Sequence, residues 1–263
     1  MPWVDGLAPA TARAGGPART RLAGMRTICG FGKPVAGLVS RLLPRRSSSP
    51  AGFSGSARAT TGRPLLNDRL GPQQHAGVVL DQVDGTTCGS AVLVALAAWA
   101  DPTELARLEA VPAGGQLLTG GGFGHRYDAR QKQVHRQTNR FWPQALGTTP
   151  WGAARWLRDH VPAAGRYRVR LVDDMSPADV EALLTGVDAA LSAGQPVPLV
   201  VGSFVPRHYV LALCRAGDGA GDGWRVYEPT SGQVRLLARA AVRERRLAPV
   251  LGFDRLHAAL LPS

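Results

Sequence analysis

The chain of 263 residues is 44% hydrophobic, which is enough for one large domain or two small ones with a sizeable core. Its formal net charge of +12 is unevenly distributed, because residues 1–70 hold 11 Lys and Arg against 2 Asp and Glu, whereas the remainder holds 20 against 17. The part expected to fold is therefore nearly neutral, and the charge does not indicate a folded nucleic-acid-binding domain.

The first 70 residues are predicted to form a disordered basic tail. Their arginines stand among Ala, Gly, Pro and Ser, a composition that cannot bury enough apolar surface to become ordered. Aromatic residues do not alternate with the basic ones, so we expect no specific nucleic-acid site, only a loose contact with anionic surfaces. Lys33, Pro34 and Arg41 interrupt the most apolar piece, which predicts no transmembrane segment and no signal peptide and favours a cytoplasmic location.

Residues 71–263 are expected to form one domain whose first half is helical. It opens with a short extended segment over 78–83. The first helix is apolar on all sides, which is typical of a buried helix, and it should end before Asp101 and Pro102. The later helices are more polar or amphipathic. The expected helices cover residues 88–100, 125–142 and 151–160.

The second half of the domain is expected to be mainly a sheet. A strand over 167–172 precedes a helix that begins at Ser176 and Pro177, in the N-cap and first-turn positions, and ends at Gly194. Turns rich in Gly, Asp and Ser then separate short apolar segments, a pattern that favours antiparallel hairpins. These strands are expected at residues 197–204, 208–214, 224–228 and 233–237. Helices followed by an antiparallel sheet predict an α+β fold.

A possible reactive thiol stands at the start of the first helix. The N-terminus of a helix carries a partial positive charge and unpaired amide N–H groups, which stabilise Cys88 as the thiolate that attacks carbonyl carbons. Gln82 lies six residues upstream, where its amide can point at an oxygen that becomes negative. His208 opens an apolar strand downstream and is followed by Glu228, so nucleophile, base and acid occur in chain order.

These motifs resemble those of the papain-like cysteine peptidases, above all the branch that processes double-glycine leader peptides of bacteriocins. The resemblance covers residues 78–237, with an unmatched middle third. It implies a papain-like fold, with the cysteine on the helical half and the histidine on the antiparallel sheet. It also implies Cys88 as nucleophile, His208 as base and Gln82 as oxyanion donor. Glu228 would orient the imidazole, where the family more often has Asp or Asn.

Four residues are expected to line the substrate cleft: Gly89, Trp142, Trp151 and Tyr209. Gly89 directly follows the cysteine, and the three aromatic residues are expected near the cleft. Trp156 lies on an apolar helical face and is expected in the core instead. The substrate would be a peptide or a protein.

The remaining cysteines and histidines predict no further site. Cys29 lies in the tail and Cys214 ends an apolar strand, where a buried structural thiol is expected. The sequence contains no Cys-x-x-Cys and no pair of histidines at ligand spacing, so we expect no metal and no cofactor. The glycine-rich stretch over 115–125 lacks the Lys-Ser/Thr of a phosphate-binding loop and is expected to be a flexible loop.

The residues leave alternatives open. In a cysteine peptidase, water releases the acyl group from the cysteine. If an amine or thiol took the place of that water, the same site would be an acyltransferase. A non-catalytic peptide-binding module on the same fold is a second alternative. In a third, the basic tail carries the biological role and the domain acts only as a scaffold.

Overall fold

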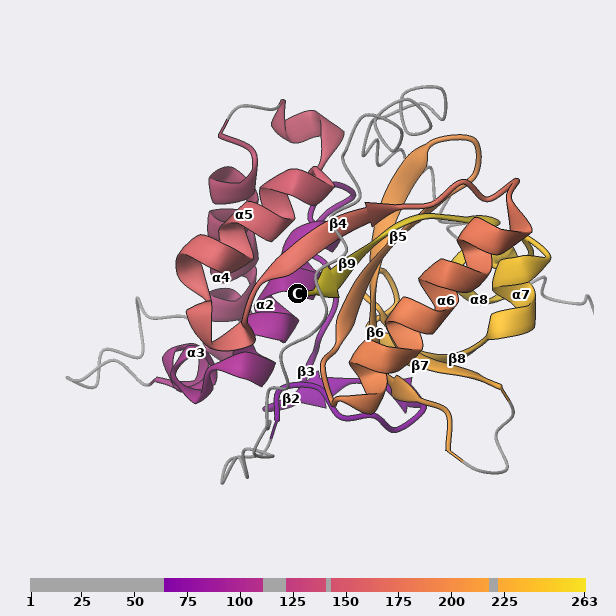
Figure 1. Ribbon diagram of the computed structural model, residues 1–263. Coiled ribbons are helices and arrows are strands. Elements are labelled where there is room, and N and C mark those ends of the chain that lie inside the picture. Colours follow the sequence, from indigo (N-terminus) through magenta and orange to yellow (C-terminus); the bar gives the residue numbers. More distant parts are fainter. Residues whose placement is uncertain (1–63, 111–121, 141–142, 218–221) are drawn as a thin grey trace, which may run out of the picture.

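The computed structural model describes residues 64–110, 122–140, 143–217 and 222–263. In this part of the chain, helices pack on both faces of a seven-stranded antiparallel sheet, which confirms the α+β class (Figure 1). The strand order is β1-β8-β7-β6-β5-β9-β4, and β2 and β3 form a separate hairpin. The strands are β1 (Gly71–Pro72), β2 (Gln74–His75), β3 (Val78–Val79), β4 (Tyr167–Leu171), β5 (Val197–Gly202), β6 (Pro206–Arg215), β7 (Gly223–Glu228), β8 (Gln233–Ala238) and β9 (Arg255–Pro262).

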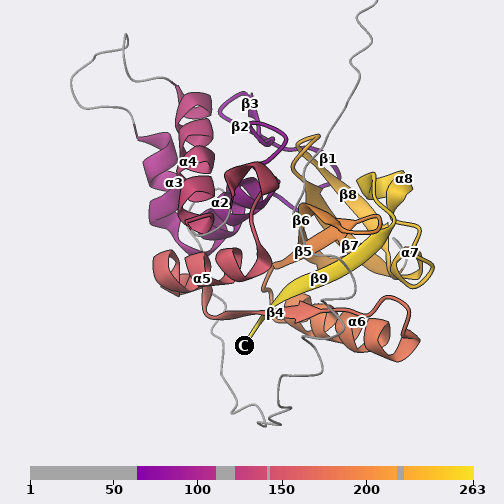
Figure 2. The same cartoon turned by 90° about the horizontal axis from the view of Figure 1, so that it is seen from above.

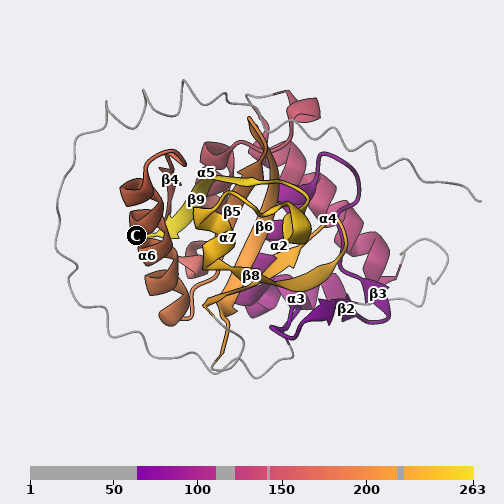
Figure 3. The same cartoon turned by 90° about the vertical axis from the view of Figure 1, so that its right-hand side faces the viewer.

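The helices form two groups, one on each face of the sheet (Figures 2 and 3). On one face lie α2 (Cys88–Ala100), α3 (Pro102–Glu109), α4 (Phe123–Thr138) and α5 (Pro150–His160). On the other lie α6 (Pro177–Ser192), α7 (Arg239–Arg243) and α8 (Ala248–Leu251). Because strand side chains alternate between faces, the sheet contributes to two separate apolar cores.

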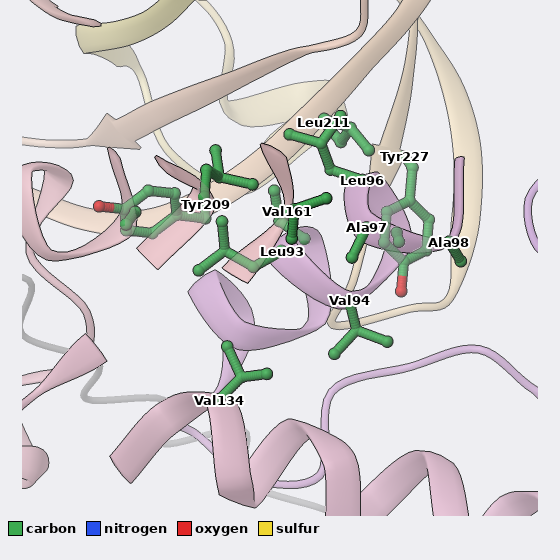
Figure 4. Close-up of a cluster of buried hydrophobic side chains, with 14 of the residues drawn as sticks. Leu93, Val94, Leu96, Ala97, Ala98, Val134, Val161, Tyr209, Leu211 and Tyr227 are labelled. Carbon is green, nitrogen blue, oxygen red and sulfur yellow. The ribbon is translucent and has the colours of Figure 1, made fainter. Parts of the chain in front are cut away.

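The central helix of the first core is α2, and its predicted range is confirmed. Apolar side chains surround it, so it is buried from Cys88 to Ala98. Figure 4 shows its side chains packed between α4 and strands β6 and β7. Asp101 ends α2 and caps α3 by accepting a hydrogen bond from the Thr103 N–H, so the chain turns sharply here. This packing fixes the N-terminus of α2 against the sheet.

The folded part begins before residue 71, where the sequence placed the end of the tail. Leu65 is buried in the first core, and the backbone N–H of Asn67 donates to Oε1 of Gln73 at 3.0 Å. Leu66 packs against the same core, and the basic composition of the segment does not reveal these contacts. The tail over residues 1–63 lies outside the described residues. No helix among the described residues is long and apolar enough to cross a membrane.

Two further findings differ from the sequence-based expectations. The C-terminal strand β9, for which no strand was expected, lies between β5 and β4 and completes the sheet. Cys214 is half-buried instead of buried, because a register shift between Ala212 and Cys214 interrupts the pairing of β6 with β7. The Cys214 thiol faces the Asp68 carboxylate at 3.8 Å, and burial together with this charge raises its pKa.

Candidate functional site

His208 and Glu228 lie on neighbouring strands at the same end of the sheet. Strands β6 and β7 run antiparallel, so the start of one meets the end of the other. Nε2 of His208 lies 2.8 Å from Oε1 of Glu228, and both side chains are almost completely buried. Two residues that are 20 positions apart in the chain are thus brought together by the hairpin.

The Glu228 carboxylate is held by the turn that follows it. The backbone N–H of Thr230 donates to Oε1 at 2.7 Å, and that of Ser231 donates to Oε2 at 3.0 Å. The Ser231 hydroxyl donates to Oε2 at 2.7 Å. Burial alone would raise the pKa of Glu228, but the imidazole of His208 and these donors lower it to about 2. Glu228 is therefore a carboxylate at neutral pH.

The thiol of Cys88 interacts with the other side of the imidazole. Helix α2 packs directly on β6, which brings its first residue to the start of that strand. Because Nε2 is engaged with Glu228, Nδ1 is the ring nitrogen left for the thiol, and no hydrogen bond to this buried atom is formed among the described residues. Burial alone would lower the pKa of His208, but interactions with Cys88 and Glu228 outweigh it and raise the pKa to about 9. Such a pair can hold a thiolate beside an imidazolium.

The loop before α2, residues 84–87, is held by hydrogen bonds from its own side chains. Oδ1 of Asp84 accepts from the N–H of Thr86 at 2.8 Å, and Oγ1 of Thr87 donates to the Asp84 carbonyl at 3.1 Å. Thr87 occupies the N-cap position of α2. Its side chain, however, turns back to Asp84 and does not cap the first-turn N–H groups of α2. The first turn of α2, beside the thiol, therefore has no side-chain cap from Thr87.

Gln82 is brought to the same turn that holds Glu228. Its backbone N–H donates to the carbonyl of Pro229 at 2.8 Å, and its Oε1 accepts from Oγ1 of Thr230 at 3.2 Å. Its Nε2 donates to the carbonyl of Asp84 at 2.7 Å. The structure therefore places Gln82 between the β7–β8 turn and the loop that leads into Cys88.

The four residues expected to line the cleft have different environments. Gly89 and Tyr209 are buried beside each other, and a Cβ atom added to Gly89 would lie 3.3 Å from Cδ2 of Tyr209 and 2.9 Å from Cβ of Thr148. They pack α2 against β6 (Figure 4 labels Tyr209). Trp151 is exposed on α5, and Trp142 lies outside the described residues. The site thus combines Gly89 and Tyr209 with Cys88, whereas the Trp151 side chain is exposed.

Sequence reasoning missed several residues that shape the site. On α4, the buried His135 accepts at Nδ1 from the Asn139 amide at 3.2 Å, and burial lowers its pKa although Asp84 and Cys88 act in the opposite direction. Gln131, also on α4, contacts the segment that carries Gln82. Both lie in a polar stretch where charged and amide residues follow one another, so nothing in the sequence distinguishes the buried ones. Gln131 and His135 share one face of α4, and only the packing of α4 against α2 shows that this face is buried.

Trp156, expected in the core, is buried, and its indole N–H donates to Oε1 of Gln137 at 2.8 Å. Among the described residues, no group of three or more His, Cys, Asp or Glu side chains is arranged to hold a metal ion. Comparison of the chain with protein-family models and with curated proteins finds no match.

Proposed function

We propose that this protein is a thiol-dependent peptidase or amidohydrolase with Cys88 as nucleophile and His208 as base. The observation that carries the proposal is the buried chain of contacts from Cys88 through His208 to Glu228. A nucleophile beside a base that is itself oriented by a third group is the arrangement that covalent acyl transfer requires. A helix that carries the thiol and packs on a sheet that carries the base also supports the resemblance to papain-like peptidases.

The reaction would begin with transfer of the Cys88 proton to Nδ1 of His208. The thiolate attacks the amide carbonyl carbon, a C–S bond forms, and the π electrons move to the oxygen. The Cys88 N–H and the Gln82 amide stabilise that oxyanion. When the oxyanion collapses, the C–N bond breaks and the imidazolium donates its proton to the leaving amine. Water, deprotonated by His208, then attacks the thioester and releases the acid and the thiol.

Glu228 keeps the imidazole in the orientation that these reaction steps need. Its carboxylate accepts from Nε2, so Nδ1 faces the thiol, and its negative charge stabilises the imidazolium formed in the first step. The side chain of Glu is one methylene longer than that of Asp. The turn donors at Thr230 and Ser231 hold both carboxylate oxygens, so the extra length does not leave the group free to rotate.

Burial of the site has consequences for reactivity. Cys88 and His208 are both about 1% exposed or less, so charges within the pair are weakly screened by water. A peptide would reach Sγ only when neighbouring side chains move aside. Small reagents would reach it more readily than a folded protein substrate.

The test uses the full chain and a mixture library of internally quenched peptides, with the products identified by mass spectrometry. The wild-type protein is expected to cleave a subset of the peptides, and Cys88→Ala is expected to lose this cleavage. Cys214→Ala, the same substitution at a thiol outside the site, should retain it. Cleavage by Cys88→Ala at the wild-type rate, or no cleavage by the wild-type protein under reducing conditions, would overturn the proposal.

A further inference from the structure

One residue of the β7–β8 turn contacts both the group that orients the base and the group that would stabilise the oxyanion. The N–H of Thr230 donates to Oε1 of Glu228 at 2.7 Å, and its hydroxyl donates to Oε1 of Gln82 at 3.2 Å. We propose that Thr230 is a positioning residue that acts through Gln82, fixing its amide so that the nitrogen faces the reacting carbonyl. This inference rests on the proposed function of Cys88 and Gln82.

The two ends of the Gln82 amide have different partners. Its nitrogen donates to the Asp84 carbonyl at 2.7 Å, and its oxygen accepts from the Thr230 hydroxyl. If the amide were flipped, its oxygen would face the Asp84 carbonyl oxygen, and two acceptors cannot share a hydrogen bond. The amide nitrogen carries two hydrogens, of which Asp84 uses one. The second is left for an oxyanion that forms at Cys88.

The backbone around Gln82 is held independently of its side chain. Gln131, fully buried on α4, donates from Nε2 to the Asp81 carbonyl at 2.9 Å and accepts at Oε1 from the Val83 N–H at 3.3 Å. Gln82 itself donates its N–H to Pro229. Because the main chain is pinned on both sides, the remaining freedom of Gln82 is rotation of its side chain. The Thr230 hydroxyl is one of the two groups that restrict this rotation.

Substitution of Thr230 by Val isolates the hydroxyl. Valine has nearly the same shape and keeps the backbone N–H, so the contact with Glu228 remains while the contact with Gln82 is lost. Thr230 is exposed, so the change removes no packing from the core. Two reagents then separate an effect on the oxyanion from an effect on the thiol itself. Acylation of Cys88 by p-nitrophenyl acetate forms a C–S bond, expels p-nitrophenolate and passes through an oxyanion, whereas alkylation by iodoacetamide displaces iodide without one.

Thr230→Val is expected to slow acylation by about 3- to 10-fold, the effect of one hydrogen bond, and to leave alkylation unchanged. Thr230→Ser should restore acylation because it restores the hydroxyl. Thr185→Val, the same substitution on the exposed surface of α6, should change neither rate. Equal slowing of both reactions would mean that Thr230 acts on the thiol or the base, and would overturn the inference, as would unchanged acylation.

A double-mutant cycle tests whether Thr230 acts through Gln82. Gln82→Ala alone is expected to slow acylation by about 100-fold or more, as loss of an oxyanion donor does. In the Gln82→Ala background, Thr230→Val should cause no further slowing. A further slowing by the same factor would refute the coupling while leaving the proposed function intact. Normal rates in Gln82→Ala would overturn the inference, because Thr230 would then have no oxyanion donor to act through. If Cys88→Ala were acylated as fast as the wild-type protein, the proposed function itself would fail.

Discussion

Nε2 of His208 lies 2.8 Å from Oε1 of Glu228, and the pair is buried where strand β6 begins and strand β7 ends. An ionised pair in this position is costly to bury unless further hydrogen bonds satisfy the carboxylate. The N–H groups of Thr230 and Ser231 and the Ser231 hydroxyl provide them. The turn after β7 is therefore as important to the site as the two ionisable residues.

Replacement of Glu228 by Gln should keep the fold but lower peptide turnover by about 10- to 100-fold, whereas His208→Ala should remove nearly all of it. The amide side chain that Glu228→Gln introduces has no negative charge to stabilise the imidazolium, so the pKa of His208 falls. The alkaline limb of the pH–rate profile, set by His208 near pH 9 in the wild type, should accordingly move to lower pH. Steady-state kinetics across pH 5–10 measures both effects.

Glu181→Gln is the matched control for this substitution. Glu181 is exposed on α6 and pairs with Arg243, and an exposed ion pair contributes little, so turnover and the pH profile should stay as in the wild type. Unchanged turnover in Glu228→Gln would mean that Cys88 and His208 work as a dyad without an orienting carboxylate.

Stability should depend on pH through the same pair. The pKa of His208 is raised from 6.5 to about 9, so its contribution to the free energy of unfolding is fully present below pH 6.5 and is lost as the pH rises through 9. The pKa of Glu228 is lowered from 4.5 to about 2, so its contribution is present above pH 4.5 and is lost as the pH falls through 2. The pair should therefore stabilise the fold most between pH 4.5 and 6.5.

Urea unfolding of the wild type and of His208→Ala at several pH values measures this dependence. The cavity left by the substitution lowers the unfolding free energy by an amount that does not vary with pH. The pH-dependent part of the difference between the two proteins should decline from pH 6 to pH 10. A constant difference over this range would show that His208 does not gain a proton on folding.

Gly89→Ala should destabilise the domain and disturb the thiol next to it. The new Cβ would lie 2.9 Å from Cβ of Thr148, which is closer than packed side chains allow. Overpacking of this kind costs about 1–3 kcal/mol. Gly217→Ala is the control, because a Cβ there would meet no atom of the described residues within 4 Å, and its effect should stay within about 0.5 kcal/mol. Equal unfolding free energies of the two variants would argue against close packing at Gly89.

The sequence alone predicted those parts of the fold that depend on local patterns. The apolar run of α2 and the Ser176 cap with Pro177 at the start of α6 are local signals, and both helices begin where expected. The central strands have short turns between them, so their antiparallel pairing follows from the turns. Strand β9 was missed because its partners, β5 and β4, are distant in the chain and no turn signals the pairing.

The candidate site was predicted in part. His208, Glu228 and the start of α2 do meet, because each lies at a recognisable end of an element. Sequence patterns did not reveal that Gln131 fixes the segment around Gln82 or that Thr230 contacts both Gln82 and Glu228. These are contacts between polar side chains of separate elements. Polar residues on α4 or in a turn look the same in the sequence whether they face solvent or a neighbouring loop.

The most direct test of the account is the pH dependence of Cys88 alkylation by iodoacetamide, followed by peptide mapping in the wild type and in His208→Ala. Cys214, whose pKa is raised, serves as an internal reference in the same samples. The account predicts that wild-type Cys88 reacts as a thiolate already at pH 6 and faster than Cys214, and that in His208→Ala its reactivity rises only near the ordinary thiol pKa of about 8.5. Identical profiles for Cys88 in the two proteins would contradict the pairing of thiol and imidazole.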